Sequence, residues 1–89
     1  MRELVFTPRF DRLFRRVPAR IRAETYEKLT LFVNDPAHPS LRVKRIKGTE
    51  AFWDMSITIL PPKDRLTFEL NEDRVMLRRI GTHDILRNP

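Results

Sequence analysis

The hydrophobic pattern changes from a helical to a strand-like period near the middle of the chain. An apolar run at residues 4–6 predicts a strand over residues 3–6, which Thr7 and Pro8 bring to an end. Thr7 can cap a following helix, and Pro8 suits its first position. The next four apolar residues fall at the spacing i, i+3, i+4, i+7: Phe10, Leu13, Phe14 and Val17. This spacing predicts an amphipathic helix of two turns.

A second helix is predicted between two proline signals. Pro18 can open it, and Asn34, Asp35 and Pro36 close it after about 16 residues. One face of this helix carries the residues Ile21, Thr25, Leu29 and Phe32, while most of its charged residues lie away from that face. The two helices are therefore expected to pack as a hairpin.

The second half of the chain alternates with the period of half-buried strands. Apolar residues occupy every second position in a predicted strand over residues 52–59: Trp53, Met55, Ile57 and Ile59. Two prolines at 61–62 turn the chain into a strand with Leu66, Phe68 and Leu70, and residues 71–73 turn it into a third over residues 75–80. Because the helices can cover only one face of this three-stranded antiparallel meander, we predict an α+β two-layer sandwich of order β-α-α-β-β-β.

Composition limits the classes of protein that fit. A chain of 89 residues is expected to form a single domain over residues 1–89. It has no cysteine, which excludes a disulfide framework and suits the cytoplasm, and no apolar run is long enough to span a membrane. Two distant histidines make a zinc site improbable, and two glycines cannot build a phosphate-binding glycine loop. We expect no metal and no cofactor.

The charge indicates an anionic partner. The chain has 18 basic and 12 acidic residues, a net charge of +6, and 14 of the basic residues are arginine. Arginine presents a rigid fork of donors that matches phosphate, although an arginine-rich proteome would give the same bias. The most basic segment, residues 41–47, has four basic residues and no acidic one: Arg42, Lys44, Arg45 and Lys47.

Candidate chemistry gathers near the ends of the last two strands. Arg65 shares one side of its strand with Thr67 and Glu69, and a surface salt bridge to Glu69 or Asp64 is the alternative to a functional role. The neighbours Arg78 and Arg79 would point to opposite faces of a regular strand, unless a bulge or a sheet edge intervenes.

His83 is the leading candidate for proton transfer. It follows Gly81 and Thr82 at a strand-to-loop boundary, and histidine titrates near neutrality, as RNA cleavage by the 2′-hydroxyl requires. A cap or a pair with Asp84 would be the ordinary alternative. The carboxylates of Glu50 and Asp54 are interpreted as solvated, although a strand carboxylate could also serve as a base.

The order of these segments resembles the RelE/ParE superfamily of type II toxins, in particular small RelE-like translational repressors. The resemblance covers nearly the whole chain. It depends on the helical hairpin, on Ile46, Lys47, Gly48 and Trp53, and on the segments FTPRF (6–10), DP (35–36), HPSLR (38–42), DRLTF (64–68) and RRIGTHD (78–84).

The resemblance implies a metal-independent endoribonuclease that cuts mRNA in the ribosomal A site and is held inactive by a cognate antitoxin. By this resemblance Arg65 would hold the scissile phosphate, and His83 would act as general acid or base. Arg78 or Arg79 would add a phosphate contact. Four residues would grip the ribosomal RNA backbone: Arg42, Lys44, Arg45 and Lys47. A toxin–antitoxin hetero-oligomer in the cytoplasm would follow.

Two other functions remain open. A module with this fold could bind nucleic acid or an antitoxin without cutting, or the chain could be a ParE-like inhibitor of DNA gyrase. ParE-like toxins generally lack a catalytic histidine, so the junction of Gly81, Thr82 and His83 favours the nuclease.

Overall fold

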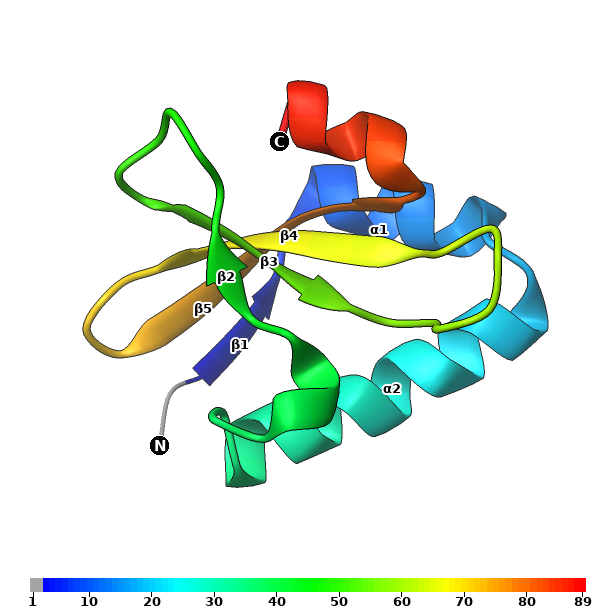
Figure 1. Ribbon diagram of the computed structural model, residues 1–89, viewed down its shortest axis with the longest axis horizontal. Coiled ribbons are helices and arrows are strands. Elements are labelled where there is room, and N and C mark those ends of the chain that lie inside the picture. The colour runs from blue at the N-terminus through cyan, green and yellow to red at the C-terminus, as the bar shows by residue number, and fades with distance from the viewer. Residues whose placement is uncertain (1–2) are drawn as a thin grey trace.

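The computed structural model describes residues 3–89, apart from the side chain of His83. Within this part a five-stranded sheet packs with two α-helices (Figure 1). The strands are β1 (Glu3–Phe6), β2 (Lys44–Arg45), β3 (Phe52–Ser56), β4 (Arg65–Leu70) and β5 (Arg74–Gly81). The helices are α1 (Pro8–Arg16) and α2 (Ala19–Asn34), and two short 3-10 helices are η1 (Pro39–Leu41) and η2 (His83–Arg87).

The first three elements begin and end where local signals place them. Thr7 caps α1, because its Oγ1 accepts a hydrogen bond from the N–H of Phe10 at 3.2 Å and donates one to the carbonyl of Leu77 at 2.6 Å. Pro18 precedes α2, which has 16 residues. The predicted strand and both predicted helices are confirmed.

The sheet has the strand order β1-β5-β4-β3-β2. The meander β3-β4-β5 is antiparallel as predicted, and β1 adds to it parallel to β5, with Leu4 opposite Val75. The predicted α+β class and the order strand, helix, helix, strands are confirmed. One strand was not predicted: the short β2 lies within the basic segment and pairs with Trp53 and Asp54 of β3.

The predicted extent of the first meander strand is wrong. β3 ends at Ser56 rather than Ile59, because Ser56 pairs with Arg65, the first residue of β4. The next two N–H groups, of residues 57 and 58, both donate to the carbonyl of Asp64 and close a loop. Ile59 beyond them is 66% exposed.

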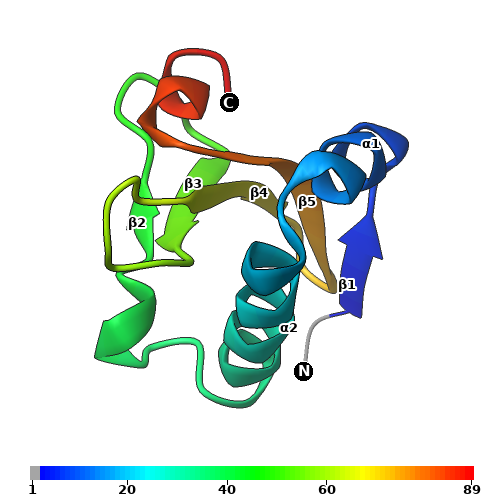
Figure 2. The same cartoon turned by 90° about the vertical axis from the view of Figure 1, so that its right-hand side faces the viewer.

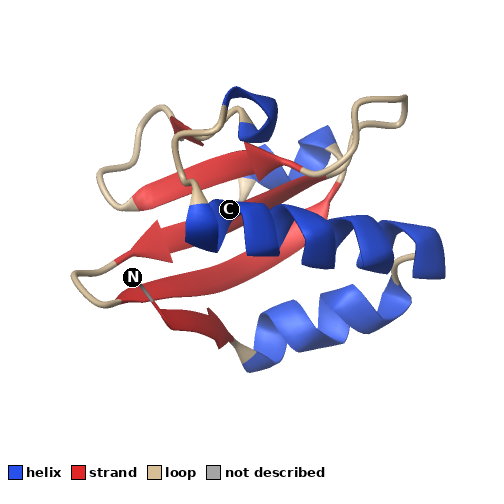
Figure 3. Cartoon of the chain, turned by 90° about the horizontal axis from the view of Figure 1, so that it is seen from below, coloured by secondary structure: helices blue, strands red, loops and turns tan. Residues whose placement is uncertain are grey.

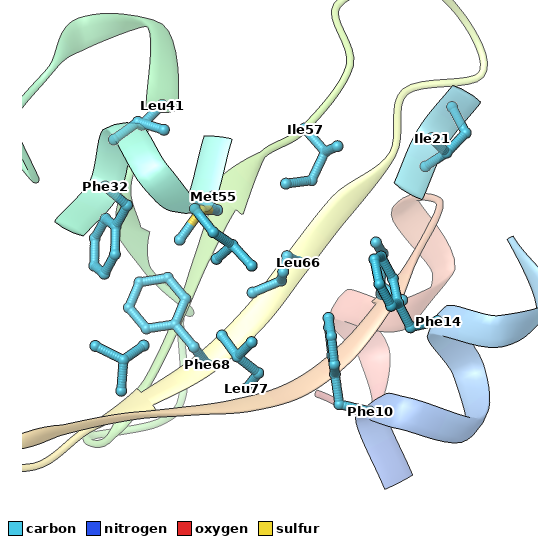
Figure 4. Packing of buried hydrophobic residues seen from close by; sticks show 13 residues of the cluster. Phe10, Phe14, Ile21, Phe32, Leu41, Met55, Ile57, Leu66, Phe68 and Leu77 are labelled. Atoms are coloured by element: carbon cyan, nitrogen blue, oxygen red, sulfur yellow. The ribbon is translucent and has the colours of Figure 1, made fainter. Parts of the chain in front are cut away.

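The core lies between α2 and the sheet, with α1 packed along β5 (Figure 2). Seen from below, the two helices lie side by side over one face of the sheet (Figure 3), and the ring centres of Phe14 and Tyr26 lie 5.3 Å apart in a T-shaped contact between them. Figure 4 shows the buried side chains that fill this layer, including Phe10, Phe14, Ile21, Phe32, Leu41, Met55, Ile57, Leu66, Phe68 and Leu77. Among the described residues, no helix is long and apolar enough to cross a membrane.

Candidate functional site

The sheet face opposite α2 is polar, and the C-terminal segment covers part of it. In Figure 2, η2 and the residues after it lie on the other side of the sheet from α2. Thr67 of β4 donates to the main-chain oxygen of Pro89 at 3.3 Å, and Arg78 of β5 donates to the same oxygen at 3.2 Å. Under this segment Thr67 is fully buried. The part of the polar face around Thr67 is therefore enclosed and hydrogen-bonded rather than solvated.

Arg65 is held on this face by a buried carboxylate. Its Nε donates to Oδ1 of Asp54 at 2.7 Å, and its Nη2 donates to the same oxygen. Only 13% of the Arg65 side chain and 1% of the Asp54 side chain are exposed. The interpretation of Asp54 as a solvated carboxylate is wrong, and so are Glu69 and Asp64 as salt-bridge partners of Arg65.

Strand pairing explains why these two residues meet. Asp54 stands opposite Thr67, and Arg65 lies two residues before Thr67 on the same face of β4. A diagonal neighbour of this kind lies within reach of a long side chain. The guanidinium turns its Nε and Nη2 toward the carboxylate, and Nη1 makes no hydrogen bond within residues 3–89. That remaining edge is the one that a ligand could contact.

A β-bulge decides the orientation of Arg78 and Arg79. Thr67 pairs with Arg79, but the next residue, Phe68, pairs with Leu77, so Arg78 is an extra residue in β5. The Arg78 guanidinium lies 4.1 Å from the ring centre of Phe52 on the polar face.

Arg79 also turns away from the core. Its N–H donates to Oγ1 of Thr67 at 3.1 Å, and its Nη1 donates to the carbonyl of Asn88 at 3.0 Å. Both arginines therefore contact the C-terminal segment, and neither points into the layer covered by α2.

The junction between β5 and η2 brings the backbone of His83 near Arg65. Gly81 pairs directly with Arg65, and η2 begins two residues later at His83. The side chain of His83 lies outside the described part of the structure. Arg65 and Thr82 line one groove of about 400 Å³, together with Lys63 and the two prolines of the β3–β4 loop. Of the residues at this junction, Arg65 and Thr82 are the ones that line the groove.

Comparison with known proteins identifies the fold. No family model matches the sequence, and no curated protein matches it. Among solved structures, YafQ from E. coli strain BL21(DE3) superposes with a TM-score of 0.75 at 16% identity, over 97% of this chain and 98% of YafQ. In the RelB-RelE antitoxin–toxin complex from Methanococcus jannaschii, the matched chain gives 0.70 at 18% identity, over 97% of this chain and 95% of that one. The chain has the RelE-type toxin fold.

A further match is the intact E. coli RelBE toxin–antitoxin complex, with a TM-score of 0.69 at 18% identity, over 92% of this chain and 96% of the matched chain. On the RelE-type fold of this chain, the residues of the basic segment lie near β2, at the opposite edge of the sheet from β1. They are exposed: Arg42, Lys44, Arg45 and Lys47. The Arg45 guanidinium lies 5.0 Å from the ring centre of Trp53. Lys44 stands directly opposite Asp54, the partner of Arg65, so this segment forms a basic edge that adjoins the polar face.

Another groove of this RelE-type fold lies beside α2. It has about 470 Å³ and is enclosed by α2 and the β3–β4 loop. Burial raises the pKa of the Asp64 carboxyl in its wall above the ordinary value of 3.8, and a hydrogen bond from Thr58 and the charge of Arg20 oppose that rise. Within the part that the structure describes, no three histidine, cysteine or acidic side chains are grouped to hold a metal ion.

Sequence reasoning missed Asp54 as the partner of Arg65 and Thr67 as a hydrogen-bonding centre. Both stand at polar positions of alternating strands, which is the pattern of a solvated face. The only available signal was their register with Arg65 and Arg79, and register depends on how the strands pair.

Proposed function

We propose that this chain is the toxin of a type II toxin–antitoxin pair and a ribosome-dependent, metal-independent endoribonuclease that cuts mRNA in the A site. The RelE-type fold supports the toxin role, since the similar structures include toxins bound to antitoxins: RelB-RelE and DinJ-YafQ. A cognate antitoxin, the ribosome and mRNA are the proposed partners, in the cytoplasm where translation occurs.

The observation that carries the nuclease proposal is the pairing of Arg65 with Gly81, two residues before His83. In the proposed reaction, a base removes the proton of the 2′-hydroxyl, whose oxygen attacks the adjacent phosphorus. The bond to the 5′-oxygen then breaks, and an acid supplies a proton to that oxygen. We assign one of these proton transfers to His83. Arg65, already oriented by Asp54, would stabilise the charge that develops on the phosphate.

The other predicted residues take supporting roles in this proposal. Arg78 and Arg79 would contact phosphates from β5. The exposed basic edge would bind the backbone of ribosomal RNA through Arg42, Lys44, Arg45 and Lys47. This edge also presents the face of Trp53 under Arg45, an arrangement that suits contact with an RNA strand.

The test is primer extension on mRNA after induction of the chain, compared between His83→Asn and the matched variant His38→Asn. His38 is the other histidine, and its Nδ1 accepts hydrogen bonds from the backbone N–H and the hydroxyl of Ser40, a capping role that asparagine can keep. We expect ribosome-dependent cuts and growth arrest with the unmodified chain and with His38→Asn, and a loss of both with His83→Asn.

The alternatives give different results in the same experiment. Arrest of replication with intact transcripts would replace the nuclease with a gyrase inhibitor. Arrest that persists in His83→Asn without any cut transcript would indicate a binding module. Co-expression with a candidate antitoxin tests the proposed partner, which should co-purify with the chain and restore growth.

A further inference from the structure

A third groove, lined by arginines, lies between α1 and the C-terminal segment. It has about 300 Å³, and Leu13 and Asn88 complete its lining. Its four basic residues come from α1 and β5: Arg9, Arg12, Arg16 and Arg79. Among the residues described, the lining includes no aspartate or glutamate. Four of the positive charges of the chain thus face one narrow space.

Helical spacing places three of these arginines in a row. Arg9, Arg12 and Arg16 are separated by three and four residues, so they follow one another along a single face of α1. The opposite face is fixed in the core by Phe10 and Phe14, which prevents the helix from turning the arginines elsewhere. At 1.5 Å per residue, the row extends for about 10 Å along the helix.

The charges in this groove are not neutralised by the protein. The salt bridges within residues 3–89 are Arg65 with Asp54 and Arg78 with Glu69, and they include none of the four groove arginines. The guanidinium of Arg79 is anchored by the carbonyl of Asn88, while its buried Nε has no acceptor among the described atoms. A buried N–H without an acceptor is uncommon in proteins, and an anion that enters beside it would complete its hydrogen bonding.

We propose that this groove binds consecutive phosphates of a single-stranded RNA backbone. The guanidinium fork matches phosphate oxygens, and a row of about 10 Å can follow two or three nucleotides. Arginine clusters also recognise acidic motifs, but a peptide that docks as a helix or strand needs apolar anchor pockets, and Leu13 is the one apolar side chain among the described lining residues. Repeating backbone phosphates fit this lining better.

Arg79 connects this groove to the polar face. It belongs to both, since it pairs with Thr67 and lines the groove with the arginines of α1. An RNA strand whose reacting phosphate lies at Arg65 can therefore continue past Arg79 onto α1. That the ligand is RNA rests on the proposed function, whereas its identity as a phosphate backbone rests on the arginines of the groove.

The test compares two double variants that remove equal charge. Arg12→Gln/Arg16→Gln removes two groove arginines, while Arg15→Gln/Arg74→Gln removes two exposed arginines outside the groove. Binding of the purified chain to a short fluorescent single-stranded RNA is measured over a range of salt concentrations. Thermal unfolding by circular dichroism should show the same midpoint for both variants, since all four side chains are exposed.

The groove variant should bind RNA about tenfold more weakly at ~0.1 M salt, and the slope of log K against log salt should decrease by about 1.4, or 0.7 for each lost phosphate contact. The control variant should change affinity less than about threefold. Arg12→Lys/Arg16→Lys keeps the charge and should recover part of the affinity.

Two results would overturn the proposal. In one, both double variants weaken RNA binding equally, which would assign binding to net charge alone. In the other, the groove variant binds RNA normally and loses affinity for a polyglutamate peptide, which would assign the groove to an acidic protein. Neither readout depends on cleavage. A chain that binds RNA through the groove but leaves mRNA uncut on the ribosome would therefore refute the nuclease and leave this inference intact.

Discussion

The ion pair between Asp54 and Arg65 predicts an asymmetric loss of stability when either partner is removed. Asp54 is 1% exposed and Arg65 is 13% exposed, so each substitution to alanine leaves the other charge largely desolvated. Removing one partner of a buried pair costs about 3–5 kcal/mol. Arg65→Ala should reach the upper part of this range, because the Asp54 carboxylate has no route to water. Asp54→Ala should cost about 3 kcal/mol or less, because Arg65 can turn into its groove.

These losses are large for a chain of this size. At about 0.05–0.15 kcal/mol per residue, the folded state is stabilised by about 4–13 kcal/mol in total. A loss of about 3 kcal/mol would lower the melting temperature by roughly 12–24 °C. The double variant Asp54→Leu/Arg65→Met removes both charges and should be more stable than either single alanine variant, since apolar side chains can replace a buried pair at little cost.

Urea unfolding of Asp54→Ala, Arg65→Ala and the double variant Asp54→Ala/Arg65→Ala measures the coupling directly. A pair that holds the two strands together should show a coupling energy of about 1 kcal/mol or more. Single variants that each lose under about 1 kcal/mol, with additive effects, would show that the pair does not hold the two strands together. The same measurement sets the temperature at which an Arg65 variant must be assayed, because loss of toxicity is informative about phosphate binding only while the chain is folded.

Two further predictions concern Gly81 and Asp64, at the adjacent ends of β5 and β4. A Cβ added at Gly81 would lie 2.8 Å from Cγ2 of Ile85, so Gly81→Ala should cost about 1–3 kcal/mol in urea unfolding, and Ile85→Ala in the same chain should recover part of the loss. For Asp64, whose pKa is raised in the folded state by burial, the folded chain binds this proton more tightly than the unfolded chain. The free energy of unfolding should therefore fall relative to Asp64→Asn as pH rises from about 3.8 through the raised pKa, and a constant difference across that window would contradict the assignment.

Local signals were sufficient for the first half of the fold. Thr7, Pro8 and Pro18 act on the residues next to them, so the positions of β1, α1 and α2 could be predicted without knowledge of their neighbours. The alternation of β4 likewise predicted its buried side. For these elements, the residues within a few positions along the chain were sufficient.

The remaining features depend on contacts between distant segments. The end of β3 at Ser56 is decided by where β4 begins, and β2 exists because residues 44–45 find a partner in β3. The burial of Asp54 depends on strand register, and the enclosure of its face depends on a C-terminal segment more than 25 residues away. Arg65 and Arg79 could be selected as candidates from the sequence, but their partners could not.

The bulge at Arg78 also shifts the alternation of inward-facing and outward-facing residues along β5. Val75, Leu77 and Ile80 are all buried, although the last two are three residues apart, which an uninterrupted strand would place on opposite sides. The inserted residue turns Ile80 back toward the core, and the side chains of Arg78 and Arg79 both point away from it. β5 can therefore bury Leu77 and Ile80 on the same side and still direct the two arginines between them, Arg78 and Arg79, away from the core. A strand with an uninterrupted two-residue repeat could not do both.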